Sequence, residues 1–269
     1  MIDILPADLL PHHAESLAIF LDRTRHDIGV EAVILGGSLV KGTARPDSDL
    51  DLMVVLTPLC YTEKQAAGNL AECIWDGPTY AGGYYDLKYV SRAILEMSAE
   101  RGSEPTRNAY VAARVVQARD PALAEIVARI GCYPEHERRE RIATFHAGLC
   151  LTSGYFWWEA RKRGDRYLLL RSAADLVMYG LRMVLAHNRV LFPCHKWLTK
   201  TVADCPETPP RILELTDLLL TNLADADMQA FNDAVLQWRD WEIEGDVLSR
   251  FVRDHEQWWQ WGGPFVNEW

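Results

Sequence analysis

The spacing of apolar residues in the first half of the chain changes repeatedly between the helical and the strand pattern. Residues 12–28 place Leu17, Phe20 and Leu21 on one face of a helix. Further helices are predicted at 38–44, 62–75, 91–100 and from Pro121 to about Ile130, and strands at 31–37, 49–56, 82–91 and 113–120. Strands mixed with helices predict a small mixed sheet covered by helices over residues 1–132.

The pattern in the second half is helical throughout. Helices are predicted at 136–163, 165–190, 208–223 and 227–257, separated by Gly164-Asp165, "FPCH" and "CPETPP". Residues 133–269 are therefore expected to form a helical bundle. The chain as a whole is predicted to be α+β, with the domain boundary near residues 131–135.

Charge and cysteine content narrow the class of protein. The net charge of -10 is spread over both halves and leaves no basic stripe, which disfavours a nucleic-acid partner. None of the six cysteines forms a C-x-x-C pair, so a zinc knuckle or redox motif is not expected. The start "MIDILPADLLPHH" does not resemble a signal peptide, and no apolar run approaches the roughly 20 residues of a membrane span. A cytoplasmic protein with reduced thiols is expected, with no membrane partner. Its oligomeric state is not predicted.

Two carboxylates at the start of an apolar strand are the first chemical feature. Asp49 and Asp51 are two residues apart, so in a strand both side chains point to one face while Leu50 and Leu52 point to the other. Two ionised carboxylates side by side repel each other, and a divalent cation removes that repulsion. Paired oxygen ligands of this kind suit Mg²⁺. The alternative is an ordinary turn at "RPDSD" in which Asp51 forms an ion pair.

A glycine-rich turn precedes this strand. Gly36, Gly37 and Ser38 lie where a predicted strand becomes a short helix. Glycines allow a phosphate to approach the backbone, and free N–H groups and the Ser38 hydroxyl can donate to it. Taken alone, the same residues are also an ordinary helix cap. Together with the two carboxylates, which follow after ten intervening residues, they indicate nucleotide chemistry.

The stretch "GGSLVKGTARPDSDLDLMVV" resembles the signature of the DNA polymerase beta-type nucleotidyltransferase superfamily, which is h-G-[GS] followed by D-h-[DE]-h. The resemblance covers residues 33–56 and is nearest to the small-molecule branch, such as the aminoglycoside adenylyltransferases. It implies a nucleotidyltransferase domain at 1–132, a helical domain at 133–269, and ATP bound between them.

The resemblance also implies roles for individual residues. A third carboxylate is expected on a later strand, and Asp86 in "GYYDLKYV" is the candidate; the alternative is a surface residue paired with Lys88. Ser48 matches a position that touches the nucleotide in the streptomycin-type enzymes. Lys196, and more weakly Arg182, match basic residues of the helical domain that contact the triphosphate. Either could equally be a solvated helix charge.

Together with the resemblance, these residues predict a magnesium-dependent adenylyltransferase. Gly37 and Ser38 would hold the β- and γ-phosphates of ATP, and Asp49 and Asp51 would hold Mg²⁺. Asp86 would complete the metal site or deprotonate a hydroxyl of a small-molecule acceptor, for which an aminoglycoside-like antibiotic is the natural class. Two alternatives stay open: a nucleotidyltransferase that modifies a protein, as in toxin–antitoxin pairs, and a non-catalytic nucleotide-binding regulatory module.

Overall fold

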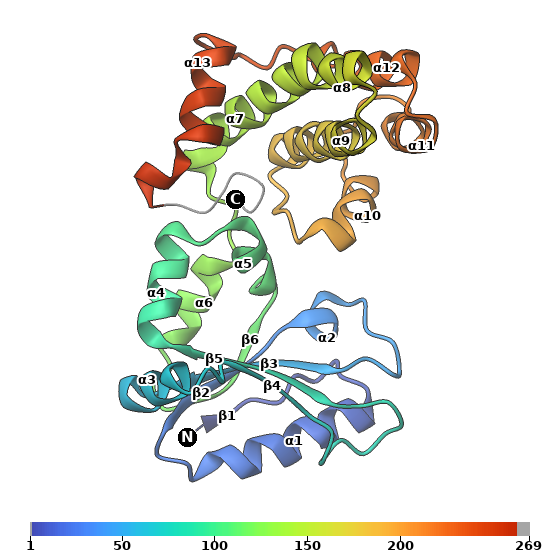
Figure 1. Ribbon diagram of the computed structural model, residues 1–269. Coiled ribbons are helices and arrows are strands. Elements are labelled where there is room, and N and C mark those ends of the chain that lie inside the picture. The colour runs from blue at the N-terminus through green and yellow to red at the C-terminus, as the bar shows by residue number, and fades with distance from the viewer. Residues whose placement is uncertain (1, 263–269) are drawn as a thin grey trace. The chain divides into compact units, whose positions relative to one another are not determined.

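A computed structural model of the protein describes residues 2–262, and its chain divides into two compact units. The first unit is Met1–Gly102 with Thr106–Cys132, and the second is Ser103–Pro105 with Tyr133–Trp269. The first contains a sheet with helices and the second is helical, which confirms the predicted α+β class (Figure 1). That the two units act as a nucleotidyltransferase domain and a helical domain stays a prediction.

The first unit is built on one six-stranded mixed sheet with the order β1-β6-β2-β3-β5-β4. Strands β3 and β5 run parallel, and every other neighbouring pair is antiparallel. The strands are β1 (Ile2–Asp3), β2 (Val30–Leu35), β3 (Leu50–Leu56), β4 (Ala71–Ile74), β5 (Tyr85–Ser91) and β6 (Arg114–Ala118).

Each face of the sheet buries its own cluster of apolar side chains. Leu50, Leu52 and Val54 of β3 belong to the cluster beneath α1 (Pro11–Arg25), whereas Met53 and Val55 belong to the opposite cluster. Helices α4 (Arg92–Arg101) and α6 (Leu123–Ile130) cover that second face (Figure 1). The alternation along β3 places residue 51 on the α4–α6 side.

The predicted helix at 62–75 is wrong in its second half. Helix α3 (Pro58–Ala66) ends before Gly68, which has a φ of +68°, and the chain then forms the edge strand β4. A left-handed glycine after the last helical turn is a common helix stop, because it adopts this conformation without a Cβ penalty. The unit also contains α2 (Gly37–Lys41) and most of the unpredicted α5 (Glu104–Ala109), whose first two residues belong to the second unit.

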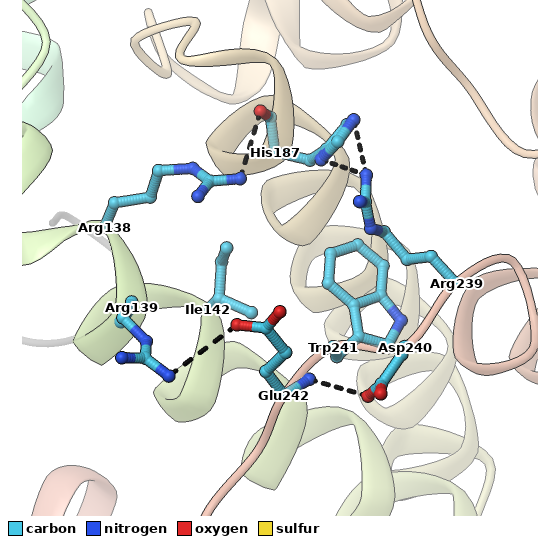
Figure 2. Close-up of a pocket in the computed structure, with 8 residues that line it drawn as sticks. All are labelled: Arg138, Arg139, Ile142, His187, Arg239, Asp240, Trp241 and Glu242. Carbon is cyan, nitrogen blue, oxygen red and sulfur yellow. Dashed lines mark hydrogen bonds and ion pairs between the residues drawn. The ribbon is translucent and has the colours of Figure 1, made fainter.

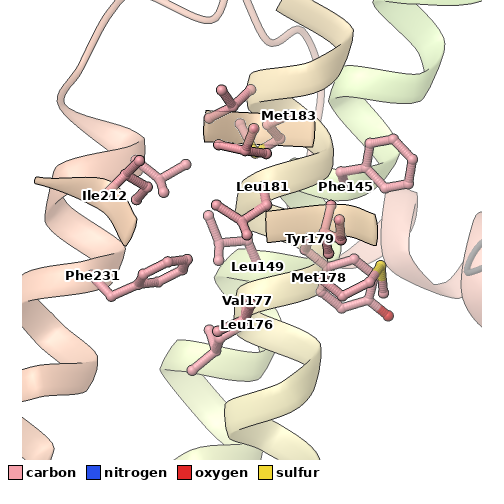
Figure 3. Close-up of a cluster of buried hydrophobic side chains, with 14 of the residues drawn as sticks. Phe145, Leu149, Leu176, Val177, Met178, Tyr179, Leu181, Met183, Ile212 and Phe231 are labelled. Carbon is pink, nitrogen blue, oxygen red and sulfur yellow. The ribbon is translucent and has the colours of Figure 1, made fainter. Parts of the chain in front are cut away.

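The second unit packs its helices around a single apolar core. Figure 3 shows Phe145 and Leu149 of α7, Leu181 of α9, and Phe231 of α12 converging in this core. The helices are α7 (Arg138–Leu151), α8 (Trp157–Arg163), α9 (Arg166–Asn188), α10 (Leu198–Ala203), α11 (Ile212–Asn222), α12 (Asp225–Leu236) and α13 (Val247–Phe251), with π-helical turns at Thr152–Phe156 and Val252–Glu256 and 3₁₀ turns at Glu135–Glu137, His195–Trp197 and Trp258–Trp261.

The predicted continuous helix at 227–257 is also wrong. Helix α12 ends at Leu236, and a loop precedes α13. Within this loop Glu242 and Gly245 adopt φ values of +50° and +88°, which a right-handed helix cannot contain.

None of the helices among residues 2–262 combines the length and the apolar character that crossing a membrane needs. All six cysteines lie within the described residues, and each is a free thiol.

Candidate active site

The candidate site lies along the side of the sheet where the ends of β2 and β4 meet the starts of β3 and β5. The amide of Gly36, just after β2, donates to the carbonyl of Asp51 at 2.9 Å. The amide of Leu50 donates to the carbonyl of Tyr84 at 3.0 Å, and Asp51 is the register partner of Asp86. Because β4 runs antiparallel to β5, its last residue, Ile74, pairs with Tyr85 at the same edge. The end of β2, the starts of β3 and β5, and the end of β4 therefore lie along one line.

The carboxylates of Asp49, Asp51 and Asp86 converge at this edge. Each offers an oxygen atom within 4.8 Å of those of the other two, and all three side chains are half-buried. Burial, with the negative charges of Asp49 and Asp86, raises the pKa of Asp51 to about 6. Lys88 and Lys41 oppose this shift only in part. Crowded hard oxygen donors whose mutual repulsion needs a counter-charge fit a divalent cation such as Mg²⁺.

Gly37 lies directly against this cluster. Its φ is +67°, and a Cβ at this position would overlap the carboxylate of Asp51. Only glycine therefore combines this backbone conformation with the position of Asp51. Ser38 follows in α2 and is half-buried, so the glycine-serine turn adjoins the carboxylates. The assignment of Gly37 and Ser38 to the triphosphate stays a prediction.

Ser48 shapes the turn that leads into Asp49. The amide of Arg45 donates to its Oγ at 2.9 Å, and the hydroxyl of Tyr80 donates to its carbonyl at 2.5 Å. The side chain is buried and is used within the turn. These contacts give Ser48 a structural role, and its predicted contact with the nucleotide stays untested.

An aromatic pair beside the carboxylates was not foreseen from the sequence. Trp75, directly after β4, stacks on Tyr84 with 4.5 Å between ring centroids. The interaction of the Tyr84 phenol with the carboxylate of Asp49 is the main reason why the pKa of Tyr84 rises to about 12. The aromatic residues of "GGYYD" next to Asp86 were a usable signal, but Trp75 was placed at the end of a predicted helix.

The two basic residues predicted from the helical half lie in different surroundings within the second unit. Lys196 is exposed in the 3₁₀ turn before α10, with its ammonium group 5.2 Å from the ring centroid of Trp197. The side chain of Arg182 is 0% exposed and forms an ion pair with Glu104 at 3.4 Å. Its guanidinium group also packs against the rings of Phe145 and Phe192. These contacts indicate that Arg182 stabilises the core of its unit. A phosphate contact for either residue stays untested.

The second unit also has a pocket of its own between α7, the end of α9 and the loop after α12 (Figure 2). Its cationic side chains are already engaged. Arg138 donates to the carbonyls of Ala186 and His187, Arg139 forms an ion pair with Glu242, and Arg239 contacts the ring of His187. These contacts close the end of α9 against the loop, and we assign no ligand to the pocket.

Comparisons with known proteins found one family match and a similar solved structure. Residues 17–72 match the family model described as "Nucleotidyltransferase domain". A solved structure of a nucleotidyltransferase-like protein from Exiguobacterium sibiricum 255-15 is similar at 12% sequence identity, covering 92% of this chain and 91% of that chain, with a TM-score of 0.48. No curated protein matches the chain. The family match covers Gly37, Asp49 and Asp51, so the residues that form the glycine turn and the first two carboxylates lie within the matched segment.

Proposed function

We propose that the protein is a magnesium-dependent adenylyltransferase, which moves AMP from ATP to a hydroxyl group of a small molecule. The observation that carries the proposal is the convergence of Asp49, Asp51 and Asp86 beside Gly37. The nucleotidyltransferase match over residues 17–72 supports the class of reaction. The choice of ATP, of adenylyl transfer and of a small acceptor follows the sequence resemblance. A cytoplasmic location, and the absence of nucleic-acid and membrane partners, remain predictions.

Each residue of the site has a role in this reaction. The backbone at Gly37 and the hydroxyl of Ser38 bind the β- and γ-phosphates and orient the pyrophosphate as the leaving group. Asp49, Asp51 and Asp86 would hold Mg²⁺, which when bound offsets the charge of the phosphates and carboxylates. The acceptor oxygen attacks the α-phosphorus in line, and the bond from this phosphorus to the pyrophosphate oxygen breaks. Asp86 is the proposed base that accepts the hydroxyl proton.

Labelled ATP tests the proposal. The purified protein is mixed with Mg²⁺, ATP labelled at the α-phosphate, and a panel of hydroxylated small molecules that includes aminoglycosides. We expect label to move to at least one acceptor with release of pyrophosphate. The Asp49→Asn and Asp51→Asn variants should lose at least about 100-fold in rate, because the charges that hold the metal are lost. Asp22→Asn, an exposed aspartate on α1, should behave like the wild type.

The outcomes separate the alternatives. Label that appears on a protein, and not on small molecules, would favour a protein-modifying enzyme. ATP binding without pyrophosphate release would favour a regulatory module. Full activity in Asp51→Asn would contradict the proposed mechanism.

A further inference from the structure

We propose that Trp75 and Tyr84 form the surface that binds the acceptor, and that the acceptor carries its reactive hydroxyl on or next to a ring with a flat apolar face. This inference rests on the proposed function, because it assigns the second substrate of the same site.

The aromatic pair extends from the carboxylates to the surface of the protein. The rings of Trp75 and Tyr84 stack at an interplanar angle of 30°, and the carbonyl of Tyr84 accepts a hydrogen bond from the amide of Leu50, the residue between Asp49 and Asp51. The backbone of Tyr84 is therefore held beside the carboxylates, and its ring stacks on Trp75. Trp75 is 68% exposed despite this stacking. A tryptophan that stacks on a second ring and stays open to solvent beside the carboxylates presents a preformed aromatic face, which a substrate ring can cover.

The order of the strands indicates that the acceptor, and not the triphosphate of ATP, contacts this surface. Along the site edge, the glycine turn follows β2, Asp51 lies on β3, Asp86 lies on β5 and Trp75 follows β4. The glycine turn and the aromatic pair are thus on opposite sides of the carboxylates. In-line displacement requires the attacking oxygen and the leaving group to lie on opposite sides of the α-phosphorus. If pyrophosphate leaves towards Gly37, the acceptor enters from the side of Asp86, Tyr84 and Trp75.

The chemistry of the surface indicates the kind of acceptor. An indole face binds flat apolar faces and stacks with aromatic rings. It also attracts cations, and the neighbouring aspartates disfavour an anionic acceptor. The flat face can be the C–H face of a sugar ring or the π-face of an aromatic alcohol. These two sources share the same contact, and the test compares them directly.

The test compares KM for the acceptor with KM for ATP. Transfer from α-labelled ATP is measured for the wild type, Trp75→Ala, Trp75→Phe and the control Trp158→Ala, whose tryptophan is 45% exposed on α8. The acceptors are a methyl pyranoside, benzyl alcohol and the acyclic alcohol glycerol, together with any acceptor found in the wider panel. ATP hydrolysis to AMP without an acceptor is measured in parallel.

We expect Trp75→Ala to raise KM for ring-bearing acceptors about tenfold, which is the factor that one lost stacking contact gives. KM for ATP, ATP hydrolysis and transfer to glycerol should stay within about twofold of the wild type. Trp75→Phe should restore most of the affinity, and Trp158→Ala should change nothing. Whether the pyranoside or benzyl alcohol responds more identifies the source of the flat face.

Three results would overturn the proposal. If KM for ring-bearing acceptors is unchanged in Trp75→Ala, the surface does not bind them. If KM for ATP rises as much as KM for the acceptor, Trp75 stacks on the nucleobase instead. In both cases the wild type still turns over, so the proposed function stands. If the wild type releases no pyrophosphate with any acceptor or with water, the proposed function fails and this inference fails with it.

Discussion

Gly37 is the single residue on which the position of Asp51 depends most directly. In Gly37→Ala the new Cβ would overlap the Asp51 carboxylate, and the backbone would keep a left-handed φ of +67°. We expect the free energy of unfolding to fall by about 1–3 kcal/mol and divalent-cation binding to be lost as Asp51 is displaced. Chemical denaturation and a Mn²⁺ titration measure the two effects.

Gly42→Ala is the matched control for this substitution. Gly42 has a similar φ of +71°, but a Cβ there meets nothing within 4 Å. It should lose about 1 kcal/mol of stability from backbone strain and keep its cation binding. If both variants lose cation binding equally, the close approach of Gly37 to Asp51 is not what matters.

Asp51 gives the site a characteristic pH dependence in the absence of metal. Its pKa rises from 3.8 to about 6 in the folded state, so the folded protein binds this proton more tightly than the unfolded chain. Its contribution to stability therefore falls as pH rises from 3.8 to about 6, and is constant outside that window. The wild type should therefore lose unfolding free energy relative to Asp51→Asn as pH rises from 3.8 to about 6, with both proteins measured in EDTA.

Saturating Mg²⁺ should reduce this difference, because the cation stabilises the ionised carboxylates that repel each other without it. An identical pH profile for the wild type and Asp51→Asn would show that the Asp51 carboxyl has its ordinary pKa.

The position of a residue could be predicted where it depends on its near neighbours in the sequence, but not where it depends on contacts with distant residues. Asp49 and Asp51 were placed on one face correctly because strand periodicity acts over two residues. Trp75 was missed because its contact with Tyr84 crosses from the edge strand to its neighbour, and the edge strand itself was not predicted. For Arg182, sequence alone could not distinguish a phosphate contact from a buried ion pair with a glutamate 78 positions away.

Among the secondary-structure elements, α7 and α9 are joined by a buried ionic network centred on Glu104. Its Oε1 binds Arg141 of α7 at 2.9 Å and Arg182 of α9 at 3.4 Å, and its Oε2 accepts from the amide of Phe192 at 2.6 Å. Glu104→Ala would leave two buried guanidinium groups without this carboxylate. We expect a loss of about 3–5 kcal/mol in the free energy of unfolding, measured by chemical denaturation.

Glu214→Ala is the control, because Glu214 forms an ion pair with Arg211 at the surface of the same unit. It should change stability by less than about 1 kcal/mol. A loss for Glu104→Ala as small as for this control would mean that the network is not structural, and would reopen a functional role for Arg182.

The errors in the predicted elements have a common physical cause. Apolar spacing continued through residues 62–75 and 227–257, but left-handed residues at Gly68, Glu242 and Gly245 interrupt the backbone. Gly68 could have been recognised as a stop after α3. Glu242 could not, because a glutamate rarely adopts positive φ and only the surrounding contacts impose it.

For the chain as a whole, the change from mixed to purely helical spacing predicted the α+β class correctly. Apolar spacing predicts the class well because it sums over many residues. The strand order could not be predicted in this way, because it depends on pairings between distant segments. The order β2-β3-β5-β4 places the glycine turn, three carboxylates and the aromatic pair in one row, and no local pattern contains it.

The most direct test of the central claim is a count of Mn²⁺ ions bound to the protein by electron paramagnetic resonance, with Mn²⁺ replacing Mg²⁺. The wild type and the exposed control Asp22→Asn should bind Mn²⁺ at a site that Mg²⁺ displaces, and Asp51→Asn should lose that site. Equal binding in the wild type and Asp51→Asn, or no binding in the wild type with ATP present, would contradict a cation held by Asp49, Asp51 and Asp86.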